Sequence, residues 1–275
     1  MIKKSVLVFL VFAVWGCLAK AQENGIGRKI FQTYRDSVVT VKFVLQERAV
    51  MKGREGGSIE SKMQTNGTIV SKNGIIVCSL TTSDPSQILS QFMGANSNVS
   101  LKSKIISIKI RFPDGQEISA DILLRDPGQD LLFLKPVKKM PSSITYVHLS
   151  DSANPEIFDN IFFISRLGKM ANWAPLISAG RISGIIKEPR LSYIPESEEF
   201  ANESFGDVLG NPVFASNGKI IGIILLSKGL SSSEGATMGS MLFNSTEALG
   251  TIPVIIPAND ILKVEAQIKS VSTKK

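Results

Sequence analysis

Residues 67–77, with the sequence GTIVSKNGIIV, decide the fold class. Two short runs of β-branched residues flank Lys72-Asn73-Gly74, and Asn and Gly tolerate the left-handed backbone that tight hairpin turns need. Pro113-Asp114-Gly115 and Ser216-Asn217-Gly218 interrupt the chain in the same way. Short apolar runs separated by such turns are typical of an all-β protein.

The strand pattern occurs in two sets of six, so we expect an all-β fold of two six-stranded antiparallel barrels. Residues 22–140 are assigned to the first barrel and residues 141–275 to the second, together forming one domain. The candidate strands of the first set are Ser37–Gln46, Gly67–Ser71, Ile75–Leu80, Lys104–Phe112, Ile118–Leu124 and Leu131–Leu134. Those of the second set are Ile144–Leu149, Ile157–Ser165, Leu176–Ile186, Pro212–Ala215, Ile220–Leu226 and Thr251–Ile256.

The remaining segments are expected to be loops or helices. The end of the chain is predicted as a helix capped by Asn259 or Asp260, with one apolar face. That face consists of Ile261, Val264 and Ile268. Long loops are predicted where the sequence is rich in Gly, Ser or charge, over Glu47–Thr65, Lys187–Gly206 and Lys228–Gly250.

Residues 1–21 have the pattern of a secretory signal peptide. Lys3 and Lys4 precede an uncharged, mostly apolar run, and Ala19-Lys20-Ala21 places small residues at the cleavage positions. An alternative is lipoprotein processing at Cys17, which the bulky Trp15 disfavours. The apolar run is too short to span a bilayer, so we expect an exported periplasmic or secreted protein without a membrane span.

Composition excludes several classes of function. The 275 residues carry a formal net charge of +7, which falls to +4 when the three lysines of residues 1–21 are removed. This charge is too small to indicate a nucleic-acid partner. One His and two Cys do not suffice for a zinc site or a disulfide framework. We therefore expect no metal and no other cofactor.

Six groups of motifs occur in a consistent order along the chain. They are Gly67–Val77; Phe112–Gln116 with Asp126–Lys135; His148–Asp151 with Phe158–Gly168; Ser178–Ser183; Asp207–Pro212 with Asn217–Ile223; and Ile255–Asn259. Together they resemble the trypsin-like protease domain of the HtrA/Deg family. The resemblance covers nearly all of the chain after the signal peptide and implies the two-barrel fold. The remaining length leaves no room for the PDZ domain that many members append, so we expect none.

The same resemblance places the catalytic triad on residues that cannot perform its chemistry. Asp130 falls at the position of the orienting acid, Thr81 at that of the histidine base and Leu209 at that of the serine nucleophile. A serine protease needs a hydroxyl nucleophile and an imidazole that accepts its proton. An alignment shifted by one residue puts Val208 at the nucleophile position, which also lacks a hydroxyl. Asp207 replaces a glycine of the oxyanion turn, and a carboxylate there would repel a developing oxyanion.

Other residues offer no obvious rescue of catalysis. His148 lies on a predicted strand that opens the second barrel, and we interpret it as structural. Cys78 has no imidazole nearby in the sequence to lower its pKa, so we interpret it as a small buried apolar residue. Without an imidazole, Asp130 must find backbone or hydroxyl donors, and Thr81 or Thr82 is expected to supply one.

We therefore expect a catalytically inactive, trypsin-like pseudoprotease that binds a peptide or protein partner in its cleft. Two alternatives stay open: a serine endopeptidase with a non-standard catalytic arrangement, and a structural subunit of an active relative. One segment near the expected cleft is acidic, which would favour a basic partner. Its candidate partner-binding residues are Glu196, Glu198, Glu199, Glu203 and Asp207. Leu209 is expected to pack inward.

Overall fold

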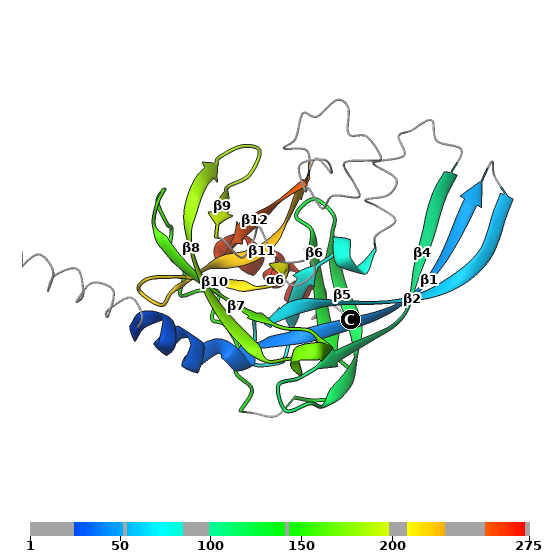
Figure 1. Ribbon diagram of the computed structural model, residues 1–275, viewed down its shortest axis with the longest axis horizontal. Helices are drawn as coiled ribbons and strands as arrows, with labels where there is room; N and C mark the ends of the chain where they lie inside the picture. Colours follow the sequence, from blue (N-terminus) through cyan, green and yellow to red (C-terminus); the bar gives the residue numbers. More distant parts are fainter. Residues whose placement is uncertain are drawn as a thin grey trace, which may run out of the picture.

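The computed structural model describes residues 25–51, 54–84, 99–140, 143–197, 208–228 and 251–272, and it contains two closed antiparallel barrels (Figure 1). The strand order is β1-β2-β3-β6-β5-β4 in the first barrel and β10-β11-β12-β9-β8-β7 in the second. This confirms the predicted fold class. The first barrel consists of β1 (Val38–Met51), β2 (Arg54–Ile69), β3 (Ile76–Ser79), β4 (Val99–Arg111), β5 (Glu117–Asp126) and β6 (Leu131–Pro136). The second consists of β7 (Asn160–Arg166), β8 (Pro175–Ile186), β9 (Ser192–Glu196), β10 (Pro212–Ala215), β11 (Ile220–Lys228) and β12 (Thr251–Pro257).

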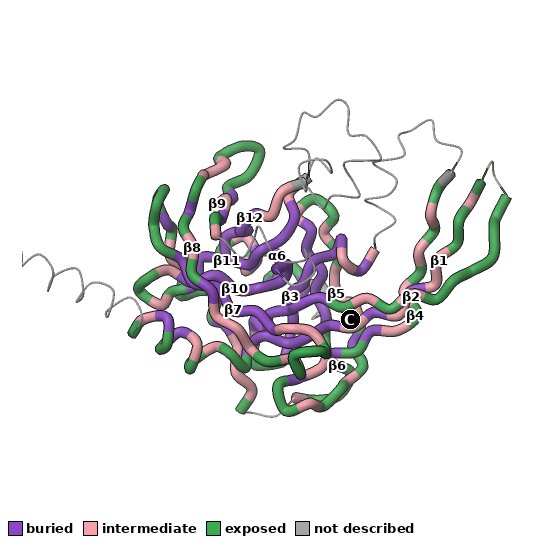
Figure 2. Tube along the Cα trace, in the orientation of Figure 1, coloured by how far each residue is buried: buried purple, intermediate pink, exposed green. Residues whose placement is uncertain are grey.

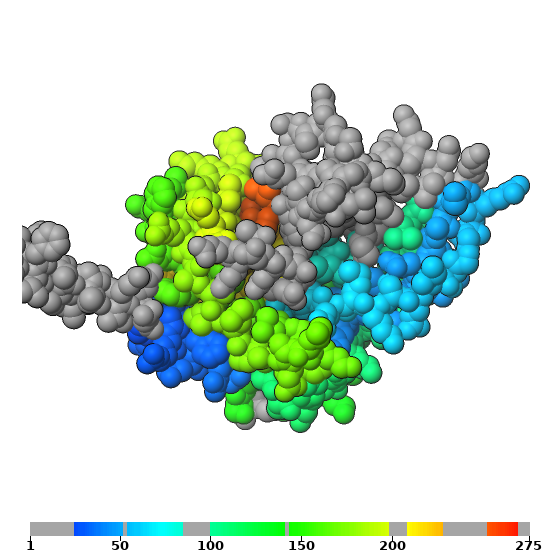
Figure 3. Space-filling model, viewed as in Figure 1, coloured from blue at the N-terminus to red at the C-terminus, as the bar shows by residue number. Residues whose placement is uncertain are grey.

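Strand β6 shows why the barrels pack together. Its residues Leu131, Leu132, Phe133 and Leu134 are all buried, so the run is continuous rather than alternating. Leu132 and Leu134 belong to the core of the first barrel. Leu131 and Phe133 point the other way, since successive strand residues face opposite sides, and join an apolar cluster that also contains residues of β10, β11 and β12. In Figure 3 the surfaces of the two barrels meet directly.

Helices close the two ends of the described chain. Helix α6 (Ala258–Ser272) follows β12 directly and buries Ile261, Val264 and Ile268 against the shared cluster, as predicted. It begins at Ala258, so Asn259 and Asp260 lie inside the first turn rather than before it. Residues 25–34 are also helical, and the Tyr34 ring stacks on Phe214 of β10 at 4.6 Å between centroids. No helix among the described residues is long and apolar enough to cross a membrane.

Strands β1, β2 and β4 continue beyond the barrel as a three-stranded arm, which projects from it in Figure 1. The pairing of β1 extends to Met51 opposite Arg54 of β2 and opposite Val99 of β4. The predicted loop over Glu47–Thr65 is therefore wrong for residues 47–51 and 54–65. The arm is mostly exposed (Figure 2), so its strands lack the alternation of buried residues, and backbone pairing to two neighbours defines them instead.

Two further predictions about the second barrel are wrong. Residues 144–149 form no strand, although Val147 and Leu149 are buried. The segment connects the barrels, and within it only Val147 donates its N–H to a strand residue, Ile69. The sixth strand is instead β9, which lies within the predicted loop Lys187–Gly206 and pairs with β8 from Ser192 to Glu196. Part of the third predicted loop, residues 229–250, lies outside the described residues.

Candidate active site

Asp130 is buried at the junction of the two barrels, with 1% of its surface exposed. It ends the turn before β6 with a φ of 56°, a left-handed conformation that Asp adopts more readily than most residues. Three donors surround its carboxylate. Ser79 Oγ donates to Oδ2 at 2.6 Å, the Thr81 N–H donates to Oδ1 at 2.7 Å, and the Leu226 N–H of β11 donates to Oδ2 at 3.0 Å. The carboxylate therefore ties the second barrel to the first.

Burial and hydrogen bonding act in opposite directions on the charge of Asp130. Removal from water raises the pKa of the carboxyl above its usual range, and this effect is the larger one. The hydrogen bonds from Ser79, Thr81 and Leu226 stabilise the charged form and lower the pKa again in part. A buried carboxylate with three donors is satisfied without an imidazole.

Thr81 lies in the short helix η2 (Thr81–Ser83), which follows β3. This helix holds Thr81 beside Asp130. The prediction that Thr81 or Thr82 would serve Asp130 is confirmed for Thr81, through its backbone N–H. Thr82 instead donates its hydroxyl to the carbonyl of Ser79 at 2.9 Å. Ser79 was not predicted as a donor. Its polarity offers a signal, since Ser79 is a polar residue at the end of an otherwise apolar strand.

Leu209 is 1% exposed and packs in the apolar core of the second barrel with Val208, Val213, Ile221 and Ile224. This confirms the expectation that it points inward. The backbone around it is held from the first barrel, because Thr65 Oγ1 donates to the Leu209 carbonyl at 3.4 Å. A fixed backbone with an apolar, inward side chain presents no nucleophile at this position.

The next residue fixes the position of this turn. Gly210 has a φ of 85°, and a Cβ there would collide with the carbonyl of Asn66. Its carbonyl accepts the hydroxyl of Thr68 at 2.7 Å, and its N–H donates to Ile224 at 2.7 Å. Residues 209 and 210 thus connect β2 of the first barrel with β11 of the second, on the same junction as Asp130.

Replacing Leu209 by serine is expected to lower the free energy of unfolding by at least about 1.5–3 kcal/mol, the value of burying a leucine side chain. The new hydroxyl would also lie in apolar surroundings without a designed partner. Leu209→Met keeps the volume and should cost less than about 1.5 kcal/mol. Thermal and denaturant unfolding measure both. An unchanged melting temperature for Leu209→Ser would contradict the packing described here.

The two other candidate reactive side chains lie away from this arrangement or are inert. His148 is exposed in the segment between the barrels, and its ring lies 4.3 Å from that of Tyr146. Its predicted strand is not formed. Cys78 is fully buried in the core of the first barrel, as predicted, and burial, followed by the charge of Asp130, raises the pKa of its thiol. Neither residue is placed as a base or a nucleophile.

The acidic segment is described only in part. Glu196 is exposed at the end of β9. Glu198, Glu199, Glu203 and Asp207 lie outside the described residues, so their position relative to the junction stays a prediction. Among the residues with described positions, no group of three His, Cys, Asp or Glu side chains could hold a metal ion.

Comparisons with known proteins agree with this architecture. Residues 65–223, more than half of the chain, match the family model of the trypsin-like peptidase domain. Among solved structures, an HtrA-type protease, the S227A form of AlgW with a tripeptide, is similar with a TM-score of 0.53 and 15% identity; the match covers 88% of this chain and 63% of that one. The MamO protease domain from Magnetospirillum magneticum matches with a TM-score of 0.49 and 16% identity, over 85% of this chain and 97% of that one. No curated protein matches the sequence.

The structural likeness is one of fold, given the low identities, whereas the family model matches the sequence itself. Its range runs from Thr65, which contacts the turn at Leu209, through Asp130 to Ile223 of β11. It therefore includes all three positions described above. The chain belongs to the family of trypsin-like peptidase domains.

Proposed function

We propose that this protein is an exported pseudoprotease: a trypsin-like domain that has lost hydrolysis and binds a peptide or protein partner in the cleft between its barrels. The observation that supports this best is Leu209, a buried apolar side chain at the position that the family resemblance gives to the nucleophile. Neither it nor its neighbour Val208 can attack a carbonyl carbon.

The other two positions support the same proposal. At the position of the histidine base stands Thr81, whose side chain cannot accept a proton at neutral pH as an imidazole does. At the position of the orienting acid, Asp130 accepts hydrogen bonds from Ser79, Thr81 and Leu226. These contacts give the carboxylate a structural role in joining the barrels, which explains its presence without catalysis.

Partner binding is the second half of the proposal. Binding of an extended peptide by strand addition is the mode that the family resemblance implies, and the HtrA-type protease of similar fold was solved with a tripeptide. The present chain covers 63% of that protein's length, so the carry-over of peptide binding belongs to the proposal. The exposed Glu196 and the four neighbouring acids of its segment would favour a basic partner, with faster association at low salt.

Labelling with a serine-directed fluorophosphonate tests the loss of the nucleophile. We expect no covalent adduct on the purified protein, whereas an active trypsin-like protease is labelled under the same conditions. An adduct that maps to one serine would contradict the proposal and favour an endopeptidase with a non-standard arrangement. Affinity capture with the chain that follows the signal peptide, and mapping of the bound segment, tests the binding function.

A further inference from the structure

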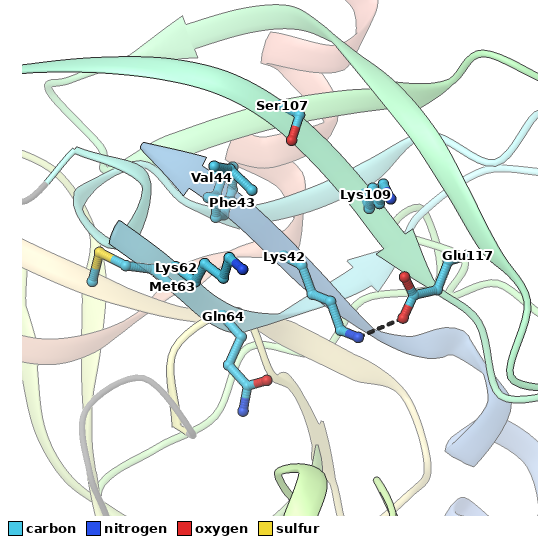
Figure 4. A pocket seen from close by; sticks show the side chains of 9 residues that line it. All are labelled: Lys42, Phe43, Val44, Lys62, Met63, Gln64, Ser107, Lys109 and Glu117. Carbon is cyan, nitrogen blue, oxygen red and sulfur yellow. Dashed lines mark hydrogen bonds and ion pairs between the residues drawn. The ribbon is translucent and has the colours of Figure 1, made fainter. Parts of the chain in front are cut away.

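The outer face of the first barrel carries an open groove of about 440 Å³, whose lining residues do not include Thr81, Asp130 or Leu209. It runs across β2, β1, β4 and β5. Figure 4 shows the side chains of Lys42, Lys62, Gln64, Lys109 and Glu117 around it, with Val44 on the middle strand. The groove is therefore basic at its rim and partly apolar at its floor.

Strand register explains why the lysines meet on this face. Lys42 of β1 lies opposite both Gln64 of β2 and Lys109 of β4, and Val44 lies opposite Lys62. Residues that are opposite one another, or two apart on the same strand, share one face of a sheet. Like charges directly opposite each other destabilise a strand pair, so Lys42 beside Lys109 is unfavourable unless a negative charge lies near.

Among the described residues that line the groove, one carries such a charge. Glu117 forms an ion pair with Lys42, and Arg111 approaches the same carboxylate at 3.8 Å. Lys62 and Lys109 form no ion pair within the part of the chain that the structure describes. The charge of Lys109 also acts on the Glu117 carboxylate. One carboxylate thus serves Lys42, Lys109 and Arg111 together, and with Lys62 the face keeps a net positive charge.

The spacing of these two lysines selects the kind of anion. Neighbouring strands lie about 4.8 Å apart and residues rise about 3.4 Å along a strand. Lys62 and Lys109 are separated by two strand spacings and by two residues along β1, so their Cα atoms lie roughly 12 Å apart. A single phosphate or carboxylate meets both ammonium groups only if both flexible side chains are ordered inward over Val44, which costs side-chain entropy. An extended peptide with acidic residues two to four positions apart carries carboxylates about 7–13 Å apart and reaches both.

The aromatic residues near the groove do not suit single-stranded nucleic acid, whose bases stack on exposed aromatic rings of the protein. Trp173, from the turn between β7 and β8, has Lys42 4.8 Å and Arg111 3.9 Å from its ring centroid. Phe43 is 1% exposed. Phe43 thus offers no face to a base, and the Trp173 ring already has two cations close to it, which favours carboxylates over phosphates with bases.

We propose that this groove binds an extended acidic segment of a partner protein, with carboxylates at Lys62 and Lys109 and an apolar side chain over Val44. The site lies on the outer face of the first barrel and does not depend on the proposed function of the cleft. It would let the protein hold a second partner whose charge is opposite to that expected for the cleft.

The test is the affinity of a fluorescently labelled peptide of alternating Glu and Val, measured by anisotropy at low salt. We expect the double variant Lys62→Gln/Lys109→Gln to bind about fivefold more weakly, because exposed ion pairs contribute about 0.2–1 kcal/mol each. The control Lys72→Gln/Lys135→Gln removes the same charge from two exposed lysines outside the groove. It should change the affinity less than about twofold.

Three results would overturn the proposal. The first is equal weakening in both double variants, since net charge alone would then account for binding. The second is equal binding of the peptide in which Gln replaces Glu. The third is an oligothymidylate with the same number of charges that binds as tightly through Lys62 and Lys109, which would make the groove a nucleic-acid surface. Unchanged melting temperatures confirm that the variants are folded.

Discussion

Replacing Asp130 by alanine is expected to lower the free energy of unfolding by about 3–5 kcal/mol, because it leaves buried donors without an acceptor. These donors are Ser79 Oγ and the N–H groups of Thr81 and Leu226. Leu226 belongs to the second barrel, so the loss should weaken the docking of the barrels as well as the turn itself. The left-handed φ of 56° adds strain for alanine.

Two variants make this measurement specific. Asp130→Asn keeps one acceptor oxygen and suits the left-handed backbone, so it should destabilise less than alanine. Asp121→Ala removes an exposed acid from β5 and should stay within about 0.5 kcal/mol of the wild type. Denaturant unfolding that gives Asp130→Ala the same stability as Asp121→Ala would show that Asp130 does not join the barrels.

The second large effect is expected for Arg166→Met, at about 3–4 kcal/mol. Arg166 is 6% exposed. Its guanidinium donates hydrogen bonds to three backbone carbonyls at 2.9 Å each, those of Arg35, Val38 and Trp173. Desolvation holds its pKa below the usual value, but a guanidinium stays protonated. Methionine fills a similar length and donates nothing, so the three carbonyls lose their donor.

Arg166 joins β7 of the second barrel to the start of β1 and to the turn before β8, so its loss should also loosen the contact between the barrels. Arg181→Met is the matched control, since Arg181 is exposed on β8. Thermal unfolding should show a large decrease for Arg166→Met and almost none for Arg181→Met. Equal melting temperatures for the two variants would contradict the role given to Arg166.

The sequence predicts the barrels well because their strands bury at least one face. The run Leu131–Leu134 is apolar because β6 is buried on both faces, and such a continuous apolar run is visible in the sequence. The hairpin turns are predicted equally well. Gly74, Gly115 and Gly218 all have the positive φ that their turn sequences predict.

The arm is missed for the opposite reason. Residues 47–51 and 54–65 form strands whose side chains are largely in solvent, so polar residues and glycines are tolerated and the pattern is that of a loop. Conversely, Val147 and Leu149 are buried without being in a strand. Hydrophobic periodicity reports burial, and it predicts secondary structure only where the two coincide.

Parts of the candidate site depend on long-range contacts that no local pattern contains. The burial of Leu209 follows from its apolar side chain, and it was predicted. The donors to Asp130 come from residues 79, 81 and 226, of which only Thr81 was expected. Arg166 carries no sequence signal at all, because its role depends on the approach of three carbonyls from distant segments.

Hydrolysis of casein by the highly purified protein is the most direct test of the central claim that this trypsin-like domain is not a peptidase. The account predicts no turnover above the blank, because neither a nucleophile at Leu209 nor a base at Thr81 is present. Turnover that stays with the protein through purification and disappears in a single variant of the junction, such as Thr81→Ala, would contradict it.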